Sequence, residues 1–138
     1  KHSCPEVEEV FVQLSIQKLK ENDLLDPSKV MFISFSKYMC ERLSVLLPEF
    51  DVQYLNGDLK PKNVKKAGIN GIDYNHSILQ IQKKWVGKAR RLGMSTNSWT
   101  VNKEHDMKAI LKMKIDMLTT DNPLQARELM KEMGINEL

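Results

Sequence analysis

Two short stretches of the 138-residue chain place small polar side chains and a tryptophan where they could hold a ligand. The first runs from Ser95 to Asn102, and the second runs from Ile115 to Pro123. Each reads as a short strand that ends in polar residues just where a helix begins, with Asn102 and Asn122 as candidate helix caps. Ligands of α/β proteins bind at the carboxyl ends of parallel strands. The two stretches therefore predict neighbouring parts of one ligand-binding rim.

Apolar patterning predicts the repeated elements that would position this rim. Strands are expected at 30–35, 51–55, 72–74, 94–99 and 116–120, so that a new strand begins about every 20 residues. Helices are expected at 5–22, 36–47, 61–67, 79–92, 103–113 and 123–133. This rhythm is typical of right-handed βα units that form one parallel sheet. The leading helix has no strand before it, which indicates a chain cut inside a repeat.

Two of the predicted helices carry clear apolar faces. The face of helix 5–22 is formed by Val7, Val10, Phe11 and Leu14. The face of helix 79–92 is formed by Ile81, Trp85, Val86, Ala89 and Leu92. Both faces are expected to pack against the sheet. Gly93 is expected to end the second helix in a left-handed conformation.

Composition excludes several classes of protein. Hydrophobic residues make up 41% of the chain, charged residues 28%, and the net charge is only +3, which is typical of a soluble globular protein without a nucleic-acid partner. The strongest basic cluster, residues 83–91, is expected to be a solvated helix face. No apolar run approaches the ~20 residues of a membrane span, and no signal peptide is visible. Cys4 and Cys40 are expected to be two separate thiols.

Five short motifs, in a fixed order and spacing, resemble one known family. They are Ile33-Ser34-Phe35-Ser36, Tyr54-Leu55-Asn56-Gly57-Asp58, Gly68-Ile69-x-Gly71-Ile72-Asp73-Tyr74, Trp99-Thr100-Val101-Asn102 and Thr119-Thr120-Asp121-x-Pro123. Together they are similar to the C-terminal part of the glycerophosphodiester phosphodiesterases. The resemblance implies an α/β fold of the (β/α)8 TIM-barrel type. It also implies hydrolysis of a glycerophosphodiester substrate to glycerol 3-phosphate and an alcohol, with a divalent metal, usually calcium or magnesium.

The resemblance covers residues 1–138 and implies a single, partial barrel domain of about five βα units plus the leading helix. A complete barrel needs about 250 residues. In the family, catalysis rests on a His-Arg-Gly motif, a Glu-x-Asp pair, a second histidine and the Glu of a Glu-x-Lys strand, and the resemblance places none of these catalytic positions within residues 1–138. The resemblance therefore implies no catalytic residue and no metal ligand in this chain. Both would lie in an N-terminal half of the barrel that precedes these residues. Lys1 is either the Lys of the Glu-x-Lys strand or, as the following His and Pro-Glu favour, the residue after it.

The remaining histidines and one lysine carry further expectations. His2 and His105 are expected in solvent near helix starts. His76 follows a predicted strand and either reaches the rim or is an ordinary loop histidine. Lys114 stands where the family usually turns with glycine, so either its side chain sits strained there or the turn differs.

Substrate contacts are expected from residues near strand ends. They are Trp99, Asn97, Asn102, Phe35 and Tyr54. Trp99 is expected to pack on the glycerol carbons with its N–H toward an oxygen, or else to fill the core. Asn102 either orients the substrate or caps the following helix, and capping is favoured. For Asp73 and Asp121, hydrogen bonds to backbone amides are favoured over metal ligation.

A second function remains open at this stage. The chain could be a non-catalytic α/β half-barrel that associates with itself or binds a small ligand. The exposed strand edges of an incomplete barrel would favour association.

Overall fold

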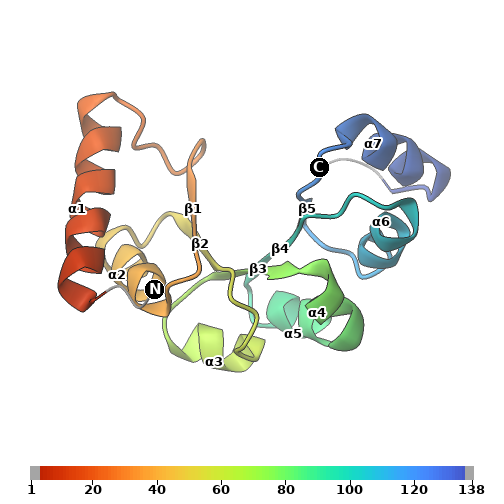
Figure 1. The fold of residues 1–138 in the computed structure, drawn as a ribbon, viewed down its shortest axis with the longest axis horizontal. Helices are drawn as coiled ribbons and strands as arrows, with labels where there is room; N and C mark the ends of the chain where they lie inside the picture. Colours follow the sequence, from red (N-terminus) through yellow and green to blue (C-terminus); the bar gives the residue numbers. More distant parts are fainter. Residues whose placement is uncertain (1–3, 136–138) are drawn as a thin grey trace.

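A computed structural model describes residues 4–135, and its centre is a five-stranded parallel sheet. The strands are β1 (Met31–Ser34), β2 (Asp51–Tyr54), β3 (Gly71–Asn75), β4 (Ser95–Trp99) and β5 (Met117–Leu118). They lie side by side in the order of the sequence (Figure 1). The predicted parallel sheet and its sequential order are therefore confirmed.

Seven helices are described, and most of them connect one strand to the next. They are α1 (Pro5–Glu21), α2 (Lys37–Leu46), α3 (Pro61–Lys66), α4 (His76–Ile81), α5 (Trp85–Arg91), α6 (Glu104–Leu111) and α7 (Pro123–Glu132). They follow one another round the outside of the strands, from α1 at one end to α7 at the other (Figure 1). The arrangement is a partial barrel, as predicted. No helix within residues 4–135 is long and apolar enough to cross a bilayer.

The core lies between the sheet and the helices. Alternate strand residues point to opposite faces, and on β2 and β3 the helix-facing residues Val52, Ile72 and Tyr74 are fully buried. Ser36 caps α2, because its hydroxyl accepts a hydrogen bond from the Met39 amide at 3.2 Å. The predicted separate thiols are confirmed, since Cys4 is exposed and Cys40 is buried, where desolvation raises the pKa of the Cys40 thiol to about 12.

The predicted helix 79–92 is wrong, because two helices occupy this segment. Helix α4 ends at Ile81 and α5 begins at Trp85. The two helices pack on different neighbours, α4 on α6 and α5 on α3, which requires a change of direction between them. Ile81, expected to be buried, is 79% exposed at this break.

Helix α1 packs on α2 through a face other than the predicted one. Val12 is fully buried, whereas Val7, Val10, Phe11 and Leu14 are 49–62% exposed. Within residues 4–135 nothing covers this stripe, so apolar periodicity alone did not identify the packed face.

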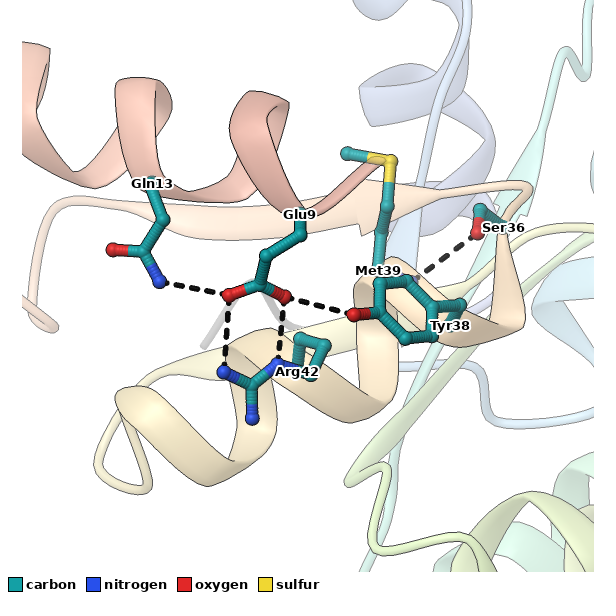
Figure 2. A network of polar contacts seen from close by, with 6 residues as sticks. All are labelled: Glu9, Gln13, Ser36, Tyr38, Met39 and Arg42. Atoms are coloured by element: carbon teal, nitrogen blue, oxygen red, sulfur yellow. Dashed lines mark hydrogen bonds and ion pairs between the residues drawn. The ribbon is translucent and has the colours of Figure 1, made fainter. Parts of the chain in front are cut away.

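A carboxylate fixes α1 against α2 (Figure 2). Glu9 accepts hydrogen bonds from Arg42 Nε at 2.8 Å, Arg42 Nη2 at 3.0 Å and the Tyr38 hydroxyl at 2.9 Å. Hydrogen bonds from Arg42, Gln13 and Tyr38 lower the pKa of the Glu9 carboxyl to about 2. The bidentate geometry is what a guanidinium offers a carboxylate, so Glu9 and Arg42 set the position of the first helix.

Two helix ends turn through left-handed backbone. Gly93 has φ +65°, as predicted, at no steric cost. Lys114 has φ +60°, in which its Cβ crowds the following carbonyl oxygen. Of the two expectations for Lys114, the structure shows the strain, which lies in the backbone.

Lys114→Gly is expected to raise the free energy of unfolding by about 0.5–1 kcal/mol, because relief of the strain exceeds the entropy that glycine gains in the unfolded chain. The Lys114 carbonyl oxygen accepts a hydrogen bond from Arg90, and that bond survives the change. Urea denaturation measures the effect. Lys112→Gly is the control, because Lys112 has ordinary helical φ of −60°, and it should lose stability. A lower midpoint for Lys114→Gly would contradict the prediction.

Candidate functional site

The face of the sheet turned away from the helices, here called the inner face, begins with a polar cluster at the amino ends of the strands. Gln53 Nε2 donates to Asp51 Oδ2 at 2.9 Å and to Ser95 Oγ at 3.0 Å, and Ser95 Oγ donates to Asp51 Oδ1 at 2.7 Å. These bonds reach from β2 to β4 across β3. They fit because β3 has Gly71 there, where a Cβ would lie 2.2 Å from Ser95 Oγ. This cluster was not predicted, although the alternation of side chains along β2 and β4 places Asp51, Gln53 and Ser95 on one face.

The next inner-face residue of β3 is a buried carboxylic acid. Asp73 is 2% exposed and pairs with Asn97 of β4. Among residues 4–135 its Oδ1 atom has no hydrogen-bond partner, so this oxygen does not make the expected bond to a backbone amide. Burial raises the pKa of the Asp73 carboxyl to about 6. Unpaired buried oxygens of this kind concentrate at functional sites.

An aromatic pair lies at the carboxyl ends of the strands. The rings of Phe35 and Trp99 meet edge to face, with centroids 5.6 Å apart and planes at 85°. Phe35 follows β1 and Trp99 ends β4, so the contact joins the ends of strands that are not neighbours in the sheet. Phe35 is 56% exposed and Trp99 is half-buried.

The indole N–H of Trp99 is already engaged. It donates to the backbone carbonyl oxygen of Asp73 at 2.9 Å. The N–H therefore points at an oxygen, as expected, and that oxygen belongs to the backbone of β3. The bond fixes the ring plane and leaves the ring itself as the surface that can contact a ligand.

Asn97 lies two residues before Trp99 and so shares its face of the strand. It is 6% exposed, and its Oδ1 accepts hydrogen bonds from the Ser98 amide at 2.8 Å and the Thr119 hydroxyl at 3.4 Å. Asn97 therefore holds β4 and the end of β5 together beneath the aromatic pair.

Asn102 does not cap α6, which corrects the favoured expectation. Lys103 occupies the cap position without a side-chain bond. Asn102 Oδ1 instead accepts from the Asp121 amide at 2.9 Å and the Thr120 hydroxyl at 3.1 Å, and Asn102 Nδ2 donates to Asp121 Oδ2 at 2.6 Å. The side chain therefore ties together the two polar junctions that the sequence pattern identified.

Tyr54 lies apart from the other candidates. It is 3% exposed, and its β-sheet partners Ser34 and Ile72 place it on the helix-facing side. Its ring packs edge to face on Tyr74, and its hydroxyl donates to Asp58 Oδ1 at 2.8 Å. The geometry does not support the expected substrate contact by Tyr54.

The sequence pattern of the glycerophosphoryl diester phosphodiesterase family matches residues 2–125. The chain belongs to this family. The resemblance carried by the motifs at the strand ends is therefore confirmed.

Solved members of the family share this fold. A glycerophosphodiester phosphodiesterase from Parabacteroides distasonis is 33% identical with a TM-score of 0.90, over 97% of this chain and 56% of that protein. A putative glycerophosphoryl diester phosphodiesterase from Silicibacter pomeroyi is 19% identical with a TM-score of 0.82, over 96% and 47%. A phosphodiesterase from Oleispira antarctica, solved with the product sn-glycerol-3-phosphate, is 19% identical with a TM-score of 0.72, over 93% and 52%.

The similarity to the two structures at 19% identity is evidence for the fold only. This chain spans about half the length of the solved proteins that it matches. No curated protein matches the chain.

The histidines that the structure describes lie in the helix layer. His105 Nε2 is 3.2 Å and His76 Nδ1 is 3.8 Å from Asp106 Oδ1, which also accepts a 2.7 Å hydrogen bond from Gln80. His76 begins α4 and reaches toward α6, so the structure favours the ordinary histidine over one at the rim. His105 is exposed, as predicted. His2 and Lys1 lie outside the described residues.

The carboxylates of this chain do not fit a metal site by themselves. Among residues 4–135 no group of three or more His, Cys, Asp or Glu side chains is placed to hold an ion. Asp58 and Asp121 follow β2 and β5 and are engaged by Tyr54 and Asn102, whereas Asp73 lies within β3. Oxygen-ligated divalent ions need several converging oxygens.

Proposed function

We propose that this chain forms the substrate-binding side of a glycerophosphodiester phosphodiesterase, which hydrolyses its substrate to glycerol 3-phosphate and an alcohol. The observation that carries the proposal is the Phe35–Trp99 pair at the carboxyl ends of the strands. Active sites of TIM barrels lie at this end. The ring of Trp99, oriented by its bond to the Asp73 carbonyl, offers a flat apolar surface for the glycerol carbons. Family membership supports the reaction.

The catalytic groups would come from a part of the barrel that this chain does not contain. The family's divalent metal, calcium or magnesium, and its pair of histidines have no counterpart among the described residues. The free edges of β1 and β5 and the exposed inner-face residues of β1 support the proposal that further strands close on this sheet. In that arrangement this chain binds and orients the substrate while the other strands supply the chemistry.

A chimera tests the proposal. This chain replaces the matching 56% of the Parabacteroides distasonis protein, so that the remaining part of that protein supplies the other strands. The chimera is expected to hydrolyse glycerophosphocholine in the presence of calcium or magnesium, whereas this chain alone is expected to show no turnover. A folded chimera without activity would contradict the proposal. Turnover of glycerophosphocholine by this chain alone, if His76→Ala abolished it, would also contradict the proposal, because the chain would then carry its own catalytic group.

Self-association is a second candidate function, favoured by the apolar surface at the β1 edge. Met31, Ile33 and Phe35 of this edge are 36–56% exposed. Val7 and Phe11 of the stripe on α1 line the same groove as Ile33 and Phe35. This groove of about 560 Å³ separates α1 from the end of β1. Its apolar lining consists of Val7, Phe11, Ile33, Phe35, Met39 and Leu55.

The purified chain is therefore expected to dimerise or aggregate, because a free strand edge beside apolar surface pairs with other chains. Light scattering over a range of concentrations measures the particle mass. Ile33→Lys should shift the population toward monomer, whereas Val45→Lys, on an exposed face of α2, should have little effect. A monodisperse, cooperatively melting wild-type monomer would contradict self-association.

A further inference from the structure

Helices α3 and α5 and the turns that precede them bring two groups of lysines together, although some 20 residues separate the groups in the sequence. The helices pack against each other on the outside of the sheet (Figure 1). We call their cationic residues the basic surface, and all eight are exposed. They are Lys60, Lys62, Lys65, Lys66, Lys83, Lys84, Lys88 and Arg91.

Negative charge is sparse along this stretch of the sequence, where Asp58, two residues before Lys60, is the one exposed carboxylate. Asp73 is the only acidic residue between Leu59 and Arg91, and it is buried on the inner face of the sheet. Within residues 4–135 none of the eight cations has an ion-pair partner, in contrast to Arg90, which lies 3.7 Å from Asp116. With a net charge of only +3 for the whole chain, positive charge is concentrated on these helices and the rest of the chain is net acidic. A helix face that only contacts solvent does not require positive charge to be concentrated in this way.

The chemistry of the surface distinguishes between polyanionic partners. Ile81, 79% exposed, stands at the break between α4 and α5, two residues before Lys83. An apolar side chain beside lysines can enter the acyl boundary of a bilayer while the amines meet lipid phosphates. Single-stranded nucleic acids need exposed aromatic rings for stacking. The one aromatic residue of α5, Trp85, is half-buried against the ring of Tyr74 at 5.9 Å.

We propose that the basic surface docks this protein on an anionic phospholipid bilayer, with Ile81 inserted at the interface. The attraction is electrostatic and is strongest at low salt, because the amines approach a surface of phosphate groups. The basic surface lies on the outer side of the helices, so docking leaves the inner face of the sheet and the Phe35–Trp99 pair uncovered. The proposal stands apart from the enzymatic one, because it concerns a different surface and a binding measurement.

Cosedimentation of the full chain with vesicles tests the proposal. Vesicles of phosphatidylcholine with about one-third phosphatidylglycerol should bind the chain, and pure phosphatidylcholine vesicles should not. Binding should fall steeply as salt rises from about 0.05 to about 0.3 M. The triple variant Lys62→Glu, Lys65→Glu, Lys66→Glu should lower the partition coefficient at least tenfold, because each lysine near such a surface contributes about fivefold. Ile81→Ser should lower it severalfold and leave the salt dependence unchanged.

A matched charge reversal provides the control. The changes Lys103→Glu, Lys112→Glu and Lys131→Glu remove the same charge from α6, α7 and their flanks, and they should leave vesicle binding within about twofold. Thermal melts establish that all variants are folded. Equal binding to neutral vesicles, or an equal loss in the control variant, would overturn the proposal. Displacement of the chain from vesicles by an RNA oligonucleotide at equal phosphate concentration would also overturn the proposal, because it would identify the basic surface as a nucleic-acid-binding surface.

Discussion

Trp99→Ala in the chimeric enzyme is expected to lower kcat/KM for glycerophosphocholine by about 10- to 100-fold, the scale of losing one well-packed aromatic contact. The ring lies at the carboxyl ends of the strands, its plane is fixed by the bond to the Asp73 carbonyl, and its edge-to-face contact with Phe35 is lost with it. Steady-state kinetics with glycerophosphocholine measure the loss.

Two comparisons separate substrate binding from stability. Trp99→Phe keeps a ring but removes the indole N–H, so it should retain most of the activity if the ring contacts the glycerol. A phosphodiester without glycerol, such as bis(4-nitrophenyl) phosphate, should be affected less than glycerophosphocholine by Trp99→Ala. Equal losses on both substrates, together with a large fall in melting temperature, would show that Trp99 acts as core.

Asp73→Asn is expected to stabilise this chain at pH 8 and to have little effect near pH 4. The pKa of the Asp73 carboxyl is about 6 in the fold, above its ordinary 3.8, so the folded state binds more protons between these values. The free energy of unfolding of the wild type therefore falls as pH rises from about 4 to about 6, and the contribution is constant above that. A shift of this size corresponds to about 3 kcal/mol, as an upper bound.

Urea denaturation at several pH values measures the difference in free energy of unfolding between the wild type and Asp73→Asn. The contributions of other titrating groups cancel in this difference. Asp51→Asn is the control on the same face. Its carboxylate accepts bonds from Ser95 on one oxygen and Gln53 on the other, and an amide can replace only one acceptor. This control should lose stability at pH 8, whereas Asp73→Asn should gain it. The prediction would be contradicted if the free energies of unfolding of the wild type and Asp73→Asn changed with pH in the same way. Ionisation of Asp73 would then not destabilise the folded state.

The sheet could be predicted from the sequence because its strands recur at a constant interval, and parallel strands in neighbouring units pair in order. The corrections fall where the deciding partner lies far along the chain. Asn102 looked like a cap on local grounds, but Thr120 and Asp121, some 18 residues later, bind its side chain instead. Competition of this kind between a cap and a distant loop leaves no local pattern.

Burial was harder to predict than apolar character. The stripe on α1 is apolar at helical spacing, yet the residue that packs on α2 is Val12, and periodicity cannot say which partner exists. Tyr54 is a different case. It follows Gln53, which belongs to the inner face, so strict alternation along β2 already placed it on the helix side. No sequence pattern marks Asp73, because residue type alone does not reveal that a carboxylate oxygen is buried without a hydrogen-bond partner among the described residues.

The sequential order of the strands has a consequence for how the chain folds. Met31 pairs with Asp51 and Asn97 with Met117, so each described strand finds its partner about 20 residues away, and within residues 4–135 the first and last strands do not pair. Only a closed barrel must bring its first and last strands together, the step with the largest loop-closure entropy. A partial barrel does not need that step, so its contacts join residues that are close in sequence and its contact order is low. It can fold from any of its βα units by adding the neighbouring unit. The chain is therefore suited to rapid, stepwise folding before any further strand joins it.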